Sequence, residues 1–445
     1  MLNILEQAQV AADRQNWSEL VQCLQQLPLK GHQPLEAENL EKAVSLAIEV
    51  LEYGDFQDRW EVEKILPNLG NGAIAPLISI LENEDADTEQ QWFAARILGK
   101  FVKPSYPVPQ RGSRRVGNRP EVIEALAKLV KNSDEDLSQI AAETLGNLGP
   151  AAVASLANLL LQEDSRQFAT EALAQIRRSE TIVPLLSVVT DSQVAVRATA
   201  IEALSSFHDS RIGPVLVAAL TDPATAVRKE AVRALGVRAY LDEEFDLVTL
   251  LKPLLWDIRL EVCQQAAIAM GRLKTDAAAA ILFELLRSAI TPVSLQIETV
   301  RALSWMETAT ALEYLKKALI ASNYHIHPTV CQEIVTVLGR WSKPELKSDA
   351  AKIIINFIES NHPAVEDAGI KQSLALALGQ LGDMRALDVL IQLLANPDNS
   401  VRLHSLSALK QLGAGEVRPK LESLLKEDNL EPRLREGIAI ALQEW

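Results

Sequence analysis

The chain has 445 residues, of which 48% are hydrophobic and only 4% aromatic, and 44 basic against 59 acidic residues give a net charge of −15. This charge disfavours nucleic acid and anionic lipid as general partners, because both are themselves anionic. No apolar run reaches the roughly 18 residues of a spanning helix, and no basic stretch precedes an apolar leader, so we expect a cytoplasmic protein without membrane insertion.

The first part of the chain, residues 1–70, shows helical periodicity in the segments ILEQAQVAADRQ, WSELVQCLQQL and AENLEKAVSLAIEVLEY. These segments do not follow the pattern of the rest of the sequence. A stack of repeats needs a terminal unit with a polar outer face. We therefore predict an N-terminal helical cap over residues 1–70.

Residues 71–445 are built from a recurring unit, an apolar helix, a short turn with Asp, Asn or Pro, and a second helix that reads V-R-x-x-A-x-x-A-L-G. The clearest copies lie at 212–236 and 386–413. Counting weaker copies gives about eleven helix pairs of roughly 34 residues each. In the 212–236 copy the apolar face is predicted to consist of Val227, Ala231, Ala234 and Leu235. One such pair cannot bury its apolar face alone, so the pairs must stack.

A glycine closes many of the second helices. We expect these glycines to adopt the left-handed conformation that ends a helix and lets the chain reverse. The positions are Gly99, Gly146, Gly236, Gly271, Gly339 and Gly379.

The turn carries a second signature, an acidic or amide residue followed six positions later by Arg. It occurs as Asp191/Arg197, Asp222/Arg228 and Asn396/Arg402. On these residues the sequence resembles the HEAT repeats, specifically the short PBS-lyase HEAT-like subtype common in cyanobacterial proteins. The resemblance implies an all-α fold, a right-handed α-solenoid, and a hydrogen-bonded ladder of these side chains between neighbouring repeats. Elsewhere the arginine position holds other residues, among them Gln91, Ser138, Cys263, Gln296 and Cys331.

The solenoid is interrupted at 103–120 by KPSYPVPQRGSRRVGNRP, whose four prolines and two glycines exclude a helix. The segment has no acidic residue and carries five positive charges, on Lys103, Arg111, Arg114, Arg115 and Arg119. Two interpretations remain open. The segment contacts an acidic partner, an acidic stretch of the same chain or an anionic ligand, or it is a solvated loop.

Trp92 and Phe93 stand just before this segment, at positions where other repeats carry polar or small residues. They are either an exposed aromatic pair of the kind found in binding hot spots or a pair that the insertion buries. The position five residues beyond the ladder arginine holds a charged residue in six of the first seven repeats, including Arg96 and Arg233. We predict that Trp92, Phe93, Arg96, Arg233 and the insertion arginines contact a partner.

Catalytic and metal motifs are scarce. GNGAIA at 70–75 matches G-x-G-x-x-A but lies between helices, where it is a turn. The sequence contains no phosphate-binding loop, no G-x-S-x-G and no His-Glu dipeptide. His325, His327 and Cys331 lie within seven residues, but without a fourth ligand they are better explained by a helix entrance, and we predict no metal site. The cysteines are odd in number and far apart, as in a reducing compartment.

The repeat architecture favours a non-catalytic scaffold that binds another protein through the concave second-helix surface, as a monomer or with weak self-association. The resemblance implies two alternatives. One is a bilin lyase or phycobiliprotein chaperone, and the other is a partner of an iron-sulphur assembly scaffold. We expect no cofactor of the chain itself, so that a bilin or an iron-sulphur cluster would be met only through a partner.

Overall fold

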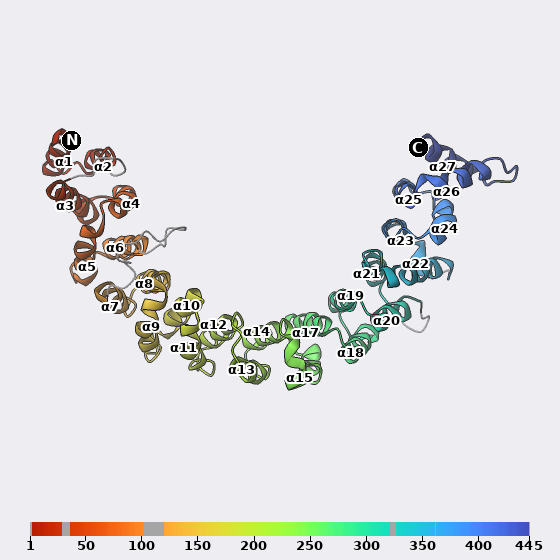
Figure 1. Cartoon of the computed structure of the whole chain (residues 1–445), viewed down its shortest axis with the longest axis horizontal. Helices are drawn as coiled ribbons and strands as arrows, with labels where there is room; N and C mark the ends of the chain where they lie inside the picture. Colours follow the sequence, from red (N-terminus) through yellow and green to blue (C-terminus); the bar gives the residue numbers. More distant parts are fainter. Residues whose placement is uncertain (1, 29–35, 102–119, 321–325, 361, 445) are drawn as a thin grey trace. The chain divides into compact units, whose positions relative to one another are not determined.

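The structure is a computed structural model that describes residues 2–28, 36–101, 120–320, 326–360 and 362–444. Within these ranges, α-helices and short 3-10 turns are the only regular structure. The chain divides into two compact units, Met1–Ile212 and Gly213–Trp445, and each consists of consecutive helix pairs (Figure 1).

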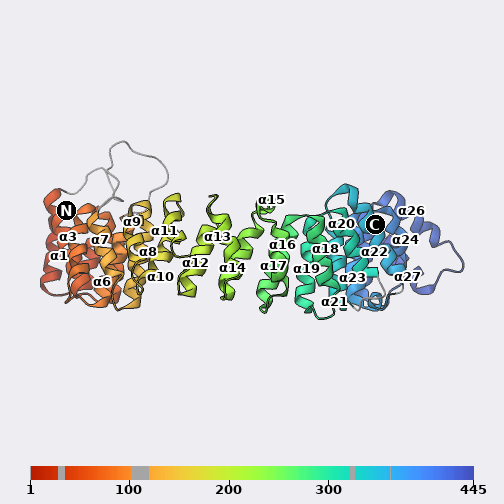
Figure 2. The same ribbon diagram turned by 90° about the horizontal axis from the view of Figure 1, so that it is seen from below.

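The described residues of unit 1 form six helix pairs. In each pair the first helix contacts the second, and each second helix contacts that of the neighbouring pair. Figure 2 shows the helices side by side along the unit. The pairs are α1 Leu2–Asp13 with α2 Trp17–Gln25, α3 Ala37–Tyr53 with α4 Phe56–Ile65, α5 Ile74–Glu82 with α6 Thr88–Lys100, α7 Pro120–Leu129 with α8 Glu135–Leu148, α9 Val153–Leu159 with α10 Arg166–Ile176, and α11 Ile182–Leu186 with α12 Val194–Leu204.

In unit 2, the part of the chain that the structure describes forms seven pairs. In the second pair the first element is broken into the short helices α15 and α16. The helices are α13 Ile212–Ala219, α14 Thr225–Gly236, α15 Asp242–Phe245, α16 Leu247–Leu251, α17 Leu260–Leu273, α18 Asp276–Arg287, α19 Val293–Met306, α20 Ala309–Ile320, α21 Pro328–Gly339, α22 Pro344–Glu359, α23 Ala368–Leu381, α24 Leu387–Leu393, α25 Asn399–Leu412, α26 Ala414–Leu424 and α27 Pro432–Gln443.

The described helices confirm the all-α solenoid. Four pairs follow α4 in unit 1 and seven form unit 2, which gives the eleven pairs expected from the sequence. We predicted a cap over residues 1–70, and the described residues of this region form two further pairs, α1 with α2 and α3 with α4.

The core lies between the two layers of helices. The predicted apolar face of α14 is buried, with Val227, Ala231 and Leu235 at 0% exposure and Ala234 at 1%. Such a face stabilises the stack by about 25 cal/mol for each Å² of apolar surface removed from water.

The second helices pack closely because small residues meet between them. Gly339 of α21 faces Ala377 of α23, and a Cβ on Gly339 would lie 2.6 Å from the Cα of Ala377. Gly236 and Gly271 face Ala269 and Ala302 in the same way. The expectation that these glycines end the helices in a left-handed conformation is wrong, since none of them has a positive φ. Four of them, Gly236, Gly271, Gly339 and Gly379, are required instead where two helix backbones approach each other.

Candidate protein-binding surface

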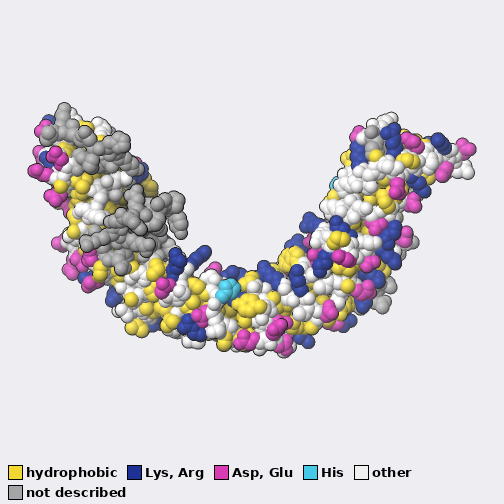
Figure 3. All heavy atoms as spheres, in the orientation of Figure 1, with side chains coloured by type: hydrophobic (Ala, Val, Ile, Leu, Met, Phe, Trp, Pro, Cys, Tyr) yellow, Lys and Arg dark blue, Asp and Glu magenta, His cyan; other side chains and the backbone are white. Residues whose placement is uncertain are grey.

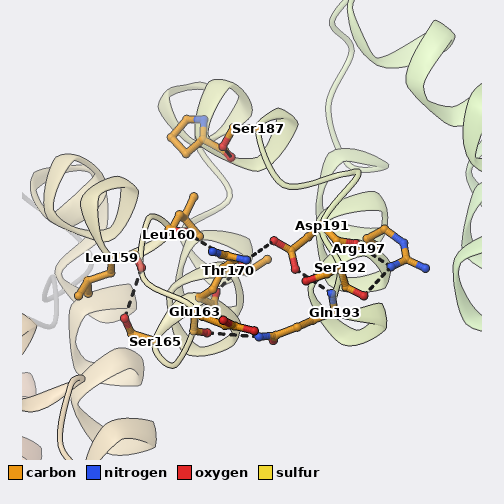
Figure 4. A network of polar contacts seen from close by, with 12 residues as sticks. Leu159, Leu160, Glu163, Ser165, Thr170, Ser187, Asp191, Ser192, Gln193 and Arg197 are labelled. Atoms are coloured by element: carbon orange, nitrogen blue, oxygen red, sulfur yellow. Dashed lines mark hydrogen bonds and ion pairs between the residues drawn. The ribbon is translucent and has the colours of Figure 1, made fainter.

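A ladder of polar contacts joins neighbouring pairs in unit 1 (Figure 4). Arg166, the first residue of α10, donates through Nε to the carbonyl oxygen of Leu160 at 2.8 Å and through Nη1 to Oδ2 of Asp191 at 2.7 Å. Asp191 also accepts the backbone N–H of Gln193 at 2.8 Å, and Arg197 donates to the Asp191 carbonyl oxygen at 2.7 Å. Asp191 therefore shapes its own turn and binds the arginine of the preceding pair.

The same arrangement recurs in unit 2 with Arg228. Its Nη1 donates to the carbonyl oxygen of Asp222 at 2.8 Å, while Nε and Nη2 donate to the two carboxylate oxygens of Asp257 at 2.8 and 2.9 Å. The side chains of Arg228 and Asp257 are only 12% and 7% exposed. Hydrogen bonds from Arg228 lower the pKa of Asp257, because they stabilise its ionised form.

Arg402 makes only the part of this arrangement that lies within its own turn. Its Nη1 donates to the carbonyl oxygen of Asn396 at 3.1 Å, and its Nη2 contacts the side-chain oxygen of Asn399. No carboxylate pairs with Arg402 among the residues that the structure describes. Its guanidinium therefore has no equivalent of Asp257.

Residues that replace arginine at the ladder position keep the contact to the turn. Cys263 donates through Sγ to the carbonyl oxygen of Asp257 at 3.1 Å, and Gln296 donates to that of Leu286 at 3.0 Å. Burial raises the pKa of the Cys263 thiol. These shorter side chains bond within their own helix pair, and in the described part of the chain none of these hydrogen bonds reaches the following pair.

Arg59 extends the ladder into residues 1–70, a role that our sequence analysis missed. It lies four residues after Asp55, which caps α4, just as Arg228 lies four residues after the N-cap of α14. Its Nη2 lies 3.1 Å from Oδ2 of Asp87, and its Nη1 lies 3.4 Å from Oε2 of Glu89. The Asp55/Arg59 spacing was the signal that could have identified it.

Phe93 is buried between α4 and α6. Its ring is 0% exposed and packs edge-on against Phe56, with the ring centres 5.5 Å apart. The prediction of an exposed aromatic pair is therefore wrong for Phe93, because its buried side chain offers no surface to a partner. Trp92 is half-buried and packs edge-on against Phe93 at 5.1 Å.

Arg96 lies between two indole rings. Its guanidinium carbon is 4.8 Å from the ring centre of Trp60 on α4 and 4.9 Å from that of Trp92 on its own helix. Its Nε donates to Oε1 of Glu63 at 2.6 Å, and Nζ of Lys100 lies 2.7 Å from the same oxygen. Since arginine both stacks on aromatic faces and pairs with carboxylates, these contacts fix the orientation of the guanidinium.

We refer to these side chains together as the α4–α6 cluster, Phe56, Trp60, Glu63, Trp92, Arg96 and Lys100. Glu63 is 1% exposed, whereas Phe56 is 56% exposed. The side chains of Arg96 and Lys100 are each 34% exposed. Because one buried carboxylate faces two cations, the cluster presents a net positive charge beside an exposed aromatic ring.

Two further arginines on the second helices, Arg233 and Arg301, pair with glutamates. Arg233 donates to Glu230 at 2.6 Å on the same helix. Arg301 of α19 donates to Glu333 of α21 at 2.8 Å, which links neighbouring second helices. With side chains about 20–45% exposed, each such pair contributes only ~0.2–1 kcal/mol.

Several predicted residues lie outside the described ranges. They are Arg111, Arg114, Arg115 and Arg119 of the insertion, and His325, the first of the three residues considered as metal ligands. The sequence predictions for them stand unchanged.

His327 and Cys331 differ in environment. His327 is exposed and accepts the backbone N–H of Thr329 through Nδ1 at 3.2 Å, so that it caps α21. Cys331 is 1% exposed, and burial raises the pKa of its thiol to about 11. In the described part of the chain, no group of three or more His, Cys, Asp or Glu side chains is arranged to hold a metal ion.

A family model for HEAT repeats matches residues 74–167, 156–236, 213–293 and 366–443, which together make up more than half of the chain. The chain belongs to the HEAT repeat family. No curated protein matches the sequence. None of the helices in the described ranges has the length and apolar character needed to cross a membrane.

Among solved structures, this HEAT repeat chain is similar to members of the importin group. A mutant of Kap121p has a TM-score of 0.59 at 13% identity, over 93% of this chain and 50% of that protein. Kap95p, in a structure that concerns its binding to RanGDP, has a TM-score of 0.56 at 13% identity, over 99% and 65%. Importin beta has a TM-score of 0.55 at 14% identity, over 98% and 66%. The chain spans half to two thirds of these proteins, and the likeness is one of fold.

Proposed function

We propose that this chain is a non-catalytic scaffold that binds a partner protein through its second helices, with the α4–α6 cluster as the main contact. Membership of the HEAT repeat family supports the general role, because a stack of repeats presents an extended surface. The fold is shared with Kap95p, whose structure concerns binding to RanGDP.

The observation that carries the proposal is the position of Arg96 between Trp60 and Trp92. Tryptophan and arginine are the residues most enriched in binding hot spots. Contacts with two rings and with Glu63 hold Arg96 in one orientation, so binding would cost little further side-chain entropy. The exposed ring of Phe56 adds apolar surface beside it.

The chemistry of the cluster indicates the kind of partner. A net positive charge beside an aromatic ring favours an acidic segment with an apolar side chain. In the sequence, the basic insertion 103–120 follows α6, which ends at Lys100. We propose that it contributes to attraction of the same acidic partner.

Affinity capture from an extract of the source cells tests the proposal. The baits are the full chain, a double variant Phe56→Ser/Arg96→Ala, and a chain lacking residues 103–119. The matched control is Arg301→Ala, because Arg301 holds the corresponding position in α19 and also pairs with a glutamate of a neighbouring helix. Circular dichroism checks that each bait is folded.

We expect at least one protein captured by the full chain and by Arg301→Ala to be reduced about tenfold with the double variant, which corresponds to ~1.4 kcal/mol of binding free energy. The chain that lacks residues 103–119 should also capture less of this protein than the full chain does. The difference should be largest at low salt, where charge attraction is strongest. An identical captured set for all four baits would refute the proposal. The finer resemblance to the PBS-lyase subtype, with its bilin and iron-sulphur alternatives, stays a prediction from sequence.

A further inference from the structure

The last helix, α27, departs from the stacking that unit 2 follows elsewhere. From α14 to α25, each second helix packs against the next, whereas α27 packs mainly against α24 and α26 (Figure 1). Gly437 of α27 lies directly against the backbone of Leu394, the C-cap of α24, and a Cβ at Gly437 would be 3.0 Å from the Leu394 Cβ. The C-terminal helix is thus drawn toward the first-helix layer.

The sequence explains this departure. Gly379 of α23 lies against Ala408 of α25, where a Cβ would be 2.8 Å from the Ala408 Cα. The equivalent residue of α25 is Lys410, because both follow an Ala-Leu pair and precede Gln-Leu-Gly. A lysine side chain is far too large for the space that Gly379 leaves against Ala408. Lys410 instead reaches Glu444 beyond the end of α27, with Nζ and Oε2 3.5 Å apart.

The departure leaves an apolar groove between α25 and α27. Its volume is about 240 Å³. Leu403 and Ile440, on opposite sides of the groove, are 65% and 45% exposed, although both are large aliphatic side chains. The lining includes Leu394, Arg402, Leu403, Leu406, Gly437 and Ile440.

Two arginines stand at one side of this groove, beside a polar hollow of about 190 Å³ that Arg402 and Arg433 line together with Glu436. Arg402 has the turn contacts described above and, within the described ranges, no carboxylate partner, in contrast to Arg166 and Arg228. In the described residues Arg433 makes no hydrogen bond or ion pair. Figure 3 shows basic, acidic and hydrophobic side chains together at the C-terminal end of unit 2.

We infer that this groove binds an amphipathic helix of a partner protein, with Leu-like side chains along one face and an Asp or Glu at one end that pairs with Arg402 and Arg433. An apolar helix face laid in a groove is a common mode of peptide recognition. The 12 residues of α27 are ~18 Å long, which matches about three turns of a bound helix. The inference rests on the proposed scaffold function and adds a second contact surface with defined chemistry.

A second copy of this chain fits the groove less well. Two copies that each carry a net charge of −15 repel each other. A two-fold contact would also place the groove opposite an identical groove, with the arginines of both copies in the same interface. A separate helix with an acidic end satisfies both the aliphatic side chains and the arginines.

Selection from a displayed library of about 16-residue helices tests the inference on the full-length chain. The library varies apolar residues on one face and all residues at both ends. Selected peptides are synthesised, and their affinities are measured by fluorescence anisotropy for the wild-type chain, Leu403→Asp and Arg433→Glu. The matched controls are Ile290→Asp, at an 85% exposed aliphatic residue elsewhere in unit 2, and Lys426→Glu, at an exposed cation between α26 and α27.

We expect the selected helices to carry Asp or Glu at one end and to bind Leu403→Asp and Arg433→Glu about tenfold or more weakly, with both controls unchanged. A peptide whose acid is replaced by Lys should bind Arg433→Glu better than the wild-type chain. No selected helix, or helices that bind Leu403→Asp as well as the wild type, would overturn the inference. Sedimentation that shows dimers of the wild type but not of Leu403→Asp would also overturn the inference, because it would show that a second copy of the chain occupies the groove.

The two proposals fail separately. The variant Phe56→Ser/Arg96→Ala lies in unit 1 and should bind the selected helices with unchanged affinity. If the double variant captures the same proteins as the full chain while helix binding depends on Leu403, the proposal for the α4–α6 cluster is refuted and the inference for the groove is supported. The opposite pattern refutes the groove and supports the cluster.

Discussion

The carboxylate of Glu63 and the guanidinium of Arg96 join α4 to α6, with Oε1 and Nε 2.6 Å apart. The Glu63 side chain is 2% exposed, while that of Arg96 is 34% exposed. Thus the buried carboxylate of Glu63 on one helix pair orients the partly exposed guanidinium of Arg96 on the next pair. The guanidinium lies between the indole rings of Trp60 and Trp92. The contact surface that we propose depends on this carboxylate, which a partner itself cannot touch.

Replacing Glu63 with Gln should destabilise unit 1. The substitution weakens charge-assisted bonds to Arg96 and Lys100, and loss of a hydrogen bond to a charged group costs about 1.5–3 kcal/mol. We expect a fall of ~2 kcal/mol in the free energy of unfolding, measured by urea denaturation with tryptophan fluorescence. The neighbouring Glu61→Gln removes a more exposed pair with Lys64 and should cost less than ~0.5 kcal/mol. Equal losses in the two variants would contradict the importance of Glu63.

The pair of Arg228 and Asp257 should make stability depend on pH. Because Arg228 lowers the pKa of Asp257 in the folded chain, the ionised pair stabilises the fold above the ordinary carboxyl pKa of about 4, and this contribution is lost as pH falls through the folded pKa. We expect Asp257→Asn to lower the melting temperature at pH 7 and the difference from wild type to shrink toward pH 2.5. Asp388→Asn, at a 77% exposed partner of Lys420, is the control with little effect at either pH. A constant difference for Asp257→Asn across this range would show that its ionisation contributes nothing.

Replacing a tightly packed glycine and an open glycine with alanine should distinguish the effect of close helix packing on stability from the effect of helix propensity. Gly339→Ala places a methyl group 2.6 Å from Ala377, and overpacking of this kind typically costs about 1–3 kcal/mol. Gly415→Ala lies in α26 with nothing within 4 Å, so the higher helix propensity of alanine should leave stability unchanged or raised by up to ~1 kcal/mol. Thermal melts of the two variants provide the comparison. A stabilised Gly339→Ala would disprove the close approach of α21 and α23.

The cysteines should be unreactive in the folded chain. Cys331 is 1% exposed and its thiol pKa is raised to about 11, so little thiolate forms near neutral pH. Cys23 and Cys263 are also buried. We expect a chromogenic disulfide reagent at pH 8 to label no thiol rapidly in the native chain and all three in denaturant. Rapid labelling of Cys331, located by peptide mapping, would contradict this.

The sequence predicts the fold well because the apolar spacing of a helix pair is a local property. Val227, Ala231 and Leu235 are recognised from their spacing and are all buried. The role of Gly339 could not be predicted, since a glycine near the end of a helix fits a chain reversal as well as it fits close contact with Ala377, and only the packing of α21 on α23 decides.

The candidate site was predicted in part. Trp92 and Arg96 were identified, but Trp60 and Glu63 are about 30 residues away in a region that lacks the repeat signature. Phe93 was misjudged as a possible surface residue because its burial depends on Phe56 of the preceding pair. Contacts between successive helix pairs determine which side chains are exposed. These contacts cannot be predicted from the alignment of the repeats alone.

The most direct test of the scaffold function is site-specific photo-crosslinking in an extract of the source cells. A benzophenone amino acid replaces Phe56, which is 56% exposed within the α4–α6 cluster, and in a control chain it replaces Val183, which is 60% exposed on α11. We predict a covalent adduct with a distinct protein at position 56 that is absent at position 183 and lost when Arg96→Ala is added. No adduct at position 56, or the same adducts at both positions, would contradict the claim that this cluster binds a partner.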